Sequence, residues 1–318
     1  MFKILVLGAT GFVGSSVCEK LVERSGGAAG RIRVATRHLT RARHLQLLPT
    51  VEVEVGDVHD DATLARMLRD TDAVINLVAV LHGSEAEFEH VHVRLPQRLA
   101  AACGRAGVRR LIHVSALGVA VDAPSRYLRS KARGEAALRA AGLDLTVLRP
   151  SIIFGERDRL LNLFASLQSV FPVMPLAGAS AQFQPVWVED VALAIARCLD
   201  TPTTVGLTIE CAGPRVFTLR ELVELAGRWS GSRRPVLALP AFLGRLQALA
   251  MELLPGPTLM SRDNIDSMQV ANVASGKLPG LDSLDIETTP LESVAPRYLG
   301  HVSGEARLEA WRARARRG

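Results

Sequence analysis

The sequence has few of the features that mark secreted or disulfide-stabilised proteins. Its 318 residues include only 4 cysteines, and no two of them form a C-x-x-C pair. We therefore expect Cys18, Cys103, Cys198 and Cys211 to be buried, reduced thiols in a reducing compartment. The N-terminus leads directly into a predicted strand and has no signal-peptide cleavage pattern, so we expect a cytoplasmic protein.

Long apolar runs are also missing. The nearest approach to one is the uncharged segment 160–188, which is interrupted by Asn162, three glutamines and three prolines. A membrane span needs about 20 mostly apolar residues, so this segment does not qualify. Its apolar side chains suit a hydrophobic substrate or a partner surface, and they equally suit the core of a small domain.

Aromatic residues make up only 4% of the chain, and the net charge is a modest +6. Half of that excess lies in residues 304–318, which contain five Arg and two Glu. A nucleic-acid-binding protein needs a basic stripe on its fold with aromatic side chains beside it, and this composition argues against one. The tail, 303–318, is either a basic amphipathic helix for anionic lipid or an acidic partner, or a solvated terminus.

Strands and helices alternate regularly in the first half of the chain. This pattern predicts an α/β fold with a doubly wound parallel sheet, whose strands are apolar throughout because both faces are covered. The predicted strands are 3–7, 32–36, 51–55, 73–78, 110–114 and 143–148, and the predicted helices are 12–24, 61–69, 87–106 and 127–141.

The alternation breaks after Pro150, which predicts a second, smaller and partly interleaved domain. We expect residues 1–155 to form the first domain, its sheet completed by parts of 184–215. The smaller domain would comprise 156–183 and 216–302, followed by the tail. Helices are predicted at 160–170, 188–199, 218–227 and 241–254, strands at 207–211 and 235–239, and loops with short elements over 255–300.

A glycine triad at the end of the first strand predicts a Rossmann-type dinucleotide site. The segment reads Gly8-Ala9-Thr10-Gly11-Phe12-Val13-Gly14 and opens the first predicted helix. The glycines permit a tight turn, close approach of the backbone to a pyrophosphate, and close packing of helix on strand. The helix N-terminus then presents free N–H groups to the phosphates.

The end of the second strand favours NADP(H) over NAD(H). An NAD site usually has Asp or Glu there to bind the ribose 2′-hydroxyl, and this strand instead ends in Thr36-Arg37-His38. Arg37, with Arg41 or Arg43 beside it, could bind a 2′-phosphate. The alternative is a solvated loop arginine.

Tyr127 and Lys131 form a Y-x-x-x-K pair on a predicted helix. Residues four apart share a helix face, and the chain has only two tyrosines and four lysines, so a chance match is uncommon. Lys131 would hold the nicotinamide ribose and lower the pKa of Tyr127, which would exchange a proton with a substrate.

Together these motifs resemble the short-chain dehydrogenase/reductase superfamily in its extended or atypical branch. The resemblance covers most of the chain. It is carried by GATGFVG at 8–14, GD at 56–57, NLVA at 76–79, HVSALG at 113–118, YLRSK at 127–131, RPSIIFG at 149–155 and PVWVEDVA at 185–192.

The resemblance implies further contacts to a bound nucleotide. Asp57 and Val58 would approach the adenine, and Asn76, Val78 and Ala79 the adenosine ribose. Pro150 and Ile152 would line the nicotinamide through their backbone. The alternative for Asp57 is a turn or helix cap, and for 76–79 a buried strand end.

The family's catalytic hydroxyl is displaced in this chain. Ser115 is the candidate, whereas most extended members carry the hydroxyl about two residues further on, where Leu117 stands. Ser115 is therefore either the group that polarises a substrate carbonyl or a strand-end hydroxyl bonded to backbone. His82, His90 and His92 lie close in sequence, but their spacing predicts no metal site.

Within the branch, the motifs most resemble the NADPH-binding accessory subunit of respiratory complex I and its bacterial relatives. The spacing of HVSALG, YLRSKARGE and RPSIIFGERD, and a late TPLESVAPRYL at 289–299, carry this likeness. It implies a tightly bound, structural NADPH, a respiratory or quinone-related partner, and a position at the inner face of the membrane. The intact Tyr127/Lys131 pair leaves open an NADPH-dependent reductase of a hydrophobic carbonyl or a quinone-biosynthesis intermediate.

Overall fold

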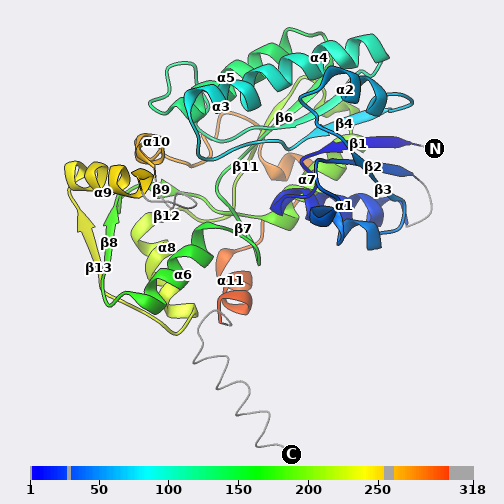
Figure 1. Cartoon of the computed structure of the whole chain (residues 1–318). Coiled ribbons are helices and arrows are strands. Elements are labelled where there is room, and N and C mark those ends of the chain that lie inside the picture. Colours follow the sequence, from blue (N-terminus) through cyan, green and yellow to red (C-terminus); the bar gives the residue numbers. More distant parts are fainter. Residues whose placement is uncertain (1, 27–29, 254–260, 301–318) are drawn as a thin grey trace, which may run out of the picture. The chain divides into compact units, whose positions relative to one another are not determined.

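The computed structural model describes residues 2–26, 30–253 and 261–300 (Figure 1). The chain divides into two compact units. The first consists of residues 1–150, 188–211 and 274–287, and the second of 151–187, 212–273 and 288–318. The predicted tail helix lies outside the described residues.

A seven-stranded sheet with every neighbouring pair parallel forms the centre of the first unit. The order is β3-β2-β1-β4-β5-β6-β11, so the chain starts in the middle, winds to one edge and then to the other. The strands are β1 (Lys3–Leu7), β2 (Arg31–Thr36), β3 (Val51–Val55), β4 (Ala73–Asn76), β5 (Arg110–Val114), β6 (Asp144–Pro150) and β11 (Thr208–Cys211). The predicted doubly wound parallel sheet is confirmed.

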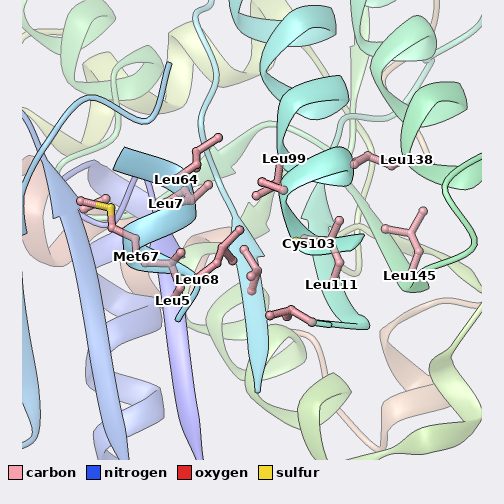
Figure 2. Packing of buried hydrophobic residues seen from close by; sticks show 14 of the residues in the cluster. Leu5, Leu7, Leu64, Met67, Leu68, Leu99, Cys103, Leu111, Leu138 and Leu145 are labelled. Carbon is pink, nitrogen blue, oxygen red and sulfur yellow. The ribbon is translucent and has the colours of Figure 1, made fainter. Parts of the chain in front are cut away.

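Helices cover both faces of this sheet (Figure 1). One face carries α1 (Phe12–Arg24) and α7 (Val188–Asp200), and the other α2 (Asp61–Met67), α4 (Leu95–Ala106) and α5 (Arg126–Arg139). Short 3₁₀ turns are η1 (Leu39–Ala42), η2 (Leu45–Leu47), η4 (Pro202–Thr204) and η5 (Leu281–Leu284). Figure 2 shows the apolar core beneath α2, α4 and α5, built from residues such as Leu5, Leu64, Leu99, Leu111 and Leu138.

The long helix predicted over 87–106 is interrupted. The structure has α3 (Glu85–Phe88), then a π-helical turn η3 (Glu89–Arg94), then α4. Pro96 accounts for the break, because it has no N–H to donate to the carbonyl of His92 four residues earlier. A π-helical turn accommodates the interruption, and such turns are frequent at functional sites.

The second unit is built on helices and short strand pairs. Its helices are α6 (Leu160–Val170), α8 (Leu219–Trp229), α9 (Ala241–Leu253), α10 (Arg262–Ser267) and α11 (Leu291–Leu299). The strand pairs are β8 (Met174–Ala177) with β13 (Val236–Leu239), β9 (Gln182–Phe183) with β12 (Phe217–Thr218), and β7 (Ile153–Phe154) with β10 (Val186–Trp187). Its core joins α6, α8 and α11 through residues such as Phe164, Leu222 and Leu299.

Residues 274–287 belong to the first unit, although the sequence places them in the smaller domain. The buried carboxylate of Glu210 on β11 accepts hydrogen bonds from the backbone N–H of Ser275 at 2.7 Å and from its hydroxyl at 3.0 Å. Arg197 on α7 also donates to the carbonyl of Leu284. These contacts join segments far apart in sequence, so local patterns cannot reveal them.

The four cysteines are free thiols and buried, as predicted. Within the described part of the chain, no helix combines the length and the apolar character needed to cross a bilayer.

Candidate nucleotide and catalytic site

The predicted phosphate loop lies between β1 and the start of α1. The N–H of Gly11 donates to the carbonyl of Gly8 at 3.1 Å, which closes the turn. Gly11 caps α1 with extended backbone and no side-chain cap, and the first turn of this fully described helix contains no acidic residue. The N–H groups of Phe12 and Val13 therefore lie at the positive end of the helix dipole, where no carboxylate of the first turn competes for them. Such a helix start suits a pyrophosphate.

Gly14 lets α1 approach this turn closely. A Cβ at this position would lie 2.4 Å from the Cα of Ala9 and 2.5 Å from the carbonyl oxygen of Gly8. Both are backbone atoms, so no side chain could rearrange to make room. Close packing of α1 on the turn therefore requires glycine at the third position of the triad. Thr10 lies half-buried in the turn itself.

The loop after β2 contacts the first turn of α1 and carries three arginines. The ring of His44 hydrogen-bonds the hydroxyl of Ser15 in the first turn of α1 at 2.8 Å. Arg37, Arg41 and Arg43 precede His44 on the same loop and are exposed. None of them forms an ion pair with another residue of the described chain, so all three retain free guanidinium groups for an anion.

Asp57 and Val58 follow β3, and the carboxylate of Asp57 accepts from the N–H of His59 at 3.0 Å. Asn76 ends β4 and is buried; its amide contacts a ring nitrogen of His113 at 3.2 Å and accepts from the N–H of Val78 at 3.2 Å. These bonds shape the strand ends, leaving Val78 half-buried and Ala79 exposed.

Tyr127 and Lys131 lie one turn apart on α5, as the motif predicts. The helix begins at Ser125, whose hydroxyl accepts from the N–H of Leu128. Lys131 is buried, and its Nζ donates to the carbonyl of Val114 at 2.9 Å. Burial lowers the pKa of Lys131 to about 8 and raises the pKa of Tyr127 to about 12. The Tyr127 phenol is therefore protonated at neutral pH, and the expectation that Lys131 lowers its pKa is wrong, because burial outweighs the effect of the lysine.

Ser115 follows Val114, the residue that anchors Lys131. Its N–H donates to the carbonyl of Leu148 at 2.7 Å, but its hydroxyl is buried with no hydrogen-bond partner in the described structure. The alternative that the Ser115 hydroxyl is bonded to the backbone is therefore wrong. Leu117, at the position where related proteins carry the hydroxyl, is buried. An unpaired buried hydroxyl is costly, and an incoming carbonyl oxygen would satisfy it.

Pro150 and Ile152 stand at the boundary between the units. The carbonyl of Pro150 accepts from the N–H of Leu117 at 2.9 Å in the first unit. In the second unit, the N–H of Ile152 donates to Asn272 Oδ1 at 2.9 Å, and its carbonyl accepts from Val186 at 3.0 Å. Both backbone groups of Ile152 are therefore already paired.

His92, on the π-helical turn, is a residue that sequence reasoning missed. Its Nε2 accepts from the N–H of Val80 at 3.1 Å, so the proton resides on Nδ1, which contacts the Ser130 hydroxyl at 2.8 Å. Ser130 in turn donates to the Tyr127 carbonyl at 2.7 Å. The ring also meets Tyr127 edge-on, with centroids 5.4 Å apart. His92 thereby connects the segment after β4 to the tyrosine helix, and only the interrupted helix around Pro96 could have signalled it.

We expect the buried histidines to make stability pH-dependent. Burial lowers the pKa of His92 from 6.5 to about 3 and holds the pKa of His113 well below its ordinary value. The unfolded chain binds more protons in this window, so the stability is fully present above pH 6.5 and is lost as pH falls toward 3. Each histidine should contribute a slope of about 1.4 kcal/mol per pH unit.

Urea unfolding at a series of pH values between neutrality and mild acid measures this slope. The His92→Asn variant keeps a polar group at the site. Its free energy of unfolding should change less steeply with pH than that of the parent, by about 1.4 kcal/mol per pH unit, the contribution of one histidine. Equal slopes in the variant and the parent would contradict the neutral, buried state of His92.

Comparison with known proteins identifies the family. The family model described as NAD(P)H-binding matches residues 8–202. The chain is 32% identical over 302 residues to the NADH dehydrogenase [ubiquinone] 1 alpha subcomplex subunit 9 of Rattus norvegicus, covering 90% of this chain and 77% of that protein. The chain belongs to the NAD(P)H-binding family of this subunit. The resemblance inferred from the motifs is confirmed.

Two further comparisons concern a reductase and a solved structure. A ceramide reductase of Caulobacter vibrioides is 28% identical over 239 residues, covering 74% of this chain and 73% of that protein. The dTDP-glucose 4,6-dehydratase DesIV of Streptomyces venezuelae, solved with NAD bound, shares the fold with a TM-score of 0.73 at 22% identity, covering 94% of this chain and 96% of that one. The proteins similar to this chain thus include both complex I subunits and a reductase. The described residues contain no grouping of three or more His, Cys, Asp or Glu suited to a metal ion.

Proposed function

We propose that this protein binds NADP(H) as a long-lived structural nucleotide and associates with a respiratory or quinone-related complex. The observation that carries the proposal is the similarity to a complex I subunit along 90% of the chain. The same likeness supports a position at the inner face of the membrane. Co-purification with respiratory-complex subunits tests the association, and a monomer that turns over rapidly without partners would contradict it.

Several groups fit the nucleotide. The uncapped start of α1 would receive the pyrophosphate, and Lys131 would hold the nicotinamide ribose once its bond to the Val114 carbonyl is exchanged. Asp57 and Asn76 would lie at the adenosine end. When bound, the nicotinamide supplies hydride-transfer chemistry. The pKa of Lys131, about 8, means that the ammonium form is available at neutral pH to donate hydrogen bonds.

Arg37 carries the preference for NADP(H) in this proposal. Its guanidinium has no ion-pair partner within the described chain, and β2 ends without a carboxylate. We expect Arg37→Ala to weaken NADPH binding by at least about tenfold while changing NADH affinity little, because only NADPH has a 2′-phosphate.

Fluorescence titration of both nucleotides measures this difference. Arg105→Ala is the matched control, because Arg105 is an exposed arginine in the last turn of α4 and its loss changes the net charge equally. Equal losses for NADPH and NADH, or a loss of the same size in the control, would contradict the role given to Arg37.

A second candidate function is an NADPH-dependent reductase of a hydrophobic carbonyl or quinone-related intermediate. It is favoured by the buried, unpaired hydroxyl of Ser115, next to the residue that anchors Lys131. Ser115 would donate to the substrate oxygen, and Tyr127, protonated at neutral pH, would deliver the proton. The similarity to a ceramide reductase supports this second candidate function.

A further inference from the structure

The two-stranded sheet formed by β8 and β13 has one face in the core of the second unit and one face outside that core. Met174, Leu176 and Val236 belong to the apolar core of this unit. Side chains alternate along a strand, so Val173, Pro175 and Leu237 point to the opposite face. Val173 is 43% exposed and Leu237 58% exposed, and Pro175 pairs directly with Leu237. The outer face of β8 and β13 is therefore apolar and accessible.

Helix α9 lies at the ends of these two strands (Figure 1). It packs there through Gly244, whose Cα is so close to Ala177 that a Cβ would lie 2.6 Å from that side chain. Away from this contact, α9 exposes Phe242 at 70% and Leu246 at 62%, one turn apart. At the other end of β8, Val170 and Phe171 are also exposed. We call these side chains the β8–α9 surface: Val170, Phe171, Val173, Leu237, Phe242 and Leu246.

The segments that carry the β8–α9 surface have a basic excess. Residues 160–188 carry no charge, and residues 225–253, through the end of α9, contain four arginines and one acidic residue, Glu252. Arg233 is exposed without an ion pair in the described structure, and Arg234 donates from Nε to the carbonyl of Gln168, close to the exposed end of α6. Arg245 pairs with Asp266 at 3.1 Å, which offsets its charge. Arginines thus outnumber carboxylates in the segments that carry the apolar side chains.

We propose that the β8–α9 surface binds an anionic phospholipid bilayer. Contiguous exposed apolar surface marks an interaction site, and a bilayer is the partner that takes apolar side chains into its acyl boundary and arginines at its phosphate level. The basic excess is what selects anionic lipid over a neutral one. This binding is additional to the proposed nucleotide role and requires neither nucleotide nor turnover.

Flotation of the full chain with vesicles tests the proposal. The protein should float with vesicles of phosphatidylcholine and phosphatidylglycerol in equal amounts, less with phosphatidylcholine alone, and less again as salt is raised. The double variant Phe242→Glu/Leu246→Glu should reduce binding by more than about tenfold, because it places two carboxylates on the lipid-facing side. Both side chains are exposed, so the fold should persist, and NADPH binding verifies this independently.

The matched control is Leu47→Glu/Val121→Glu, which adds the same charge at two exposed apolar residues of the first unit, 85% and 76% accessible. It should bind vesicles like the parent. Three results would overturn the proposal: no flotation of the parent, equal loss in both double variants, or unchanged binding in the α9 variant with loss on removal of residues 301–318. A parent dimer that becomes monomeric in the α9 variant without any vesicle binding would assign the surface to a second copy instead.

Discussion

Replacing Gly134 by alanine should lower the free energy of unfolding by about 3 kcal/mol. Gly134 lies on α5 where that helix crosses the π-helical turn, and a Cβ there would lie 2.0 Å from the carbonyl oxygen of His92. The obstacle is a backbone atom, so the two helices must separate. That movement would also disturb the His92 bonds to Val80 and Ser130.

The control for Gly134 is another glycine in a helix of the same layer. Gly104 lies within α4, and a Cβ on it would meet nothing within 4 Å. Gly104→Ala should therefore stabilise the protein by about 0.5–1 kcal/mol through helix propensity alone. Urea unfolding of both variants measures the pair. Similar effects of the same sign would contradict the close crossing of α5 and η3.

Replacing Tyr127 by phenylalanine should lower the rate of NADPH-dependent carbonyl reduction by about 10²–10⁴, if turnover is found. The hydroxyl is the only group removed, and with a pKa of about 12 it carries a proton at neutral pH. Binding of NADPH should stay within about twofold, because Lys131 and the glycine loop are unchanged.

The second tyrosine supplies a matched control for this experiment. The hydroxyl of Tyr298 donates to the buried carboxylate of Asp158 at 2.6 Å, so Tyr298→Phe should cost about 1–3 kcal/mol of stability and leave kcat unchanged. Steady-state kinetics and unfolding of both variants separate the two roles. Wild-type turnover in Tyr127→Phe would exclude this phenol as the proton donor.

Local patterns were enough to locate the strands of the central sheet and the motifs at their ends. Apolar runs and glycines at fixed spacing specified β1, the turn at 8–14 and α1, and the Y-x-x-x-K spacing placed Tyr127 and Lys131 on one helix. These features depend on residues within a few positions of one another, where helix and strand periodicity act. The strand expected over 73–78 ends two residues earlier, at Asn76.

Features that depend on contacts between distant segments could not be predicted. The His92 bonds span 12 and 38 positions, and the Glu210–Ser275 bond spans 65. The Ser115 hydroxyl is unpaired because no polar group of a distant segment lies within hydrogen-bond distance of it, and the sequence does not give those distances. Segment 160–188 shows both outcomes, because Leu161, Phe164 and Met174 enter the core while Val170 and Phe171 stay exposed. Sequence marks such side chains as apolar without saying which neighbour covers them.

The central claim is that the nucleotide is a structural component, and the nucleotide that accompanies the purified protein tests it most directly. The protein would be denatured with and without prior exposure to excess free NADP⁺, and the released nucleotide identified by mass spectrometry. We expect NADPH in near-stoichiometric amount that is not displaced by the added NADP⁺. An empty site, or a nucleotide that exchanges completely, would contradict the structural role and favour an enzyme that cycles its cofactor.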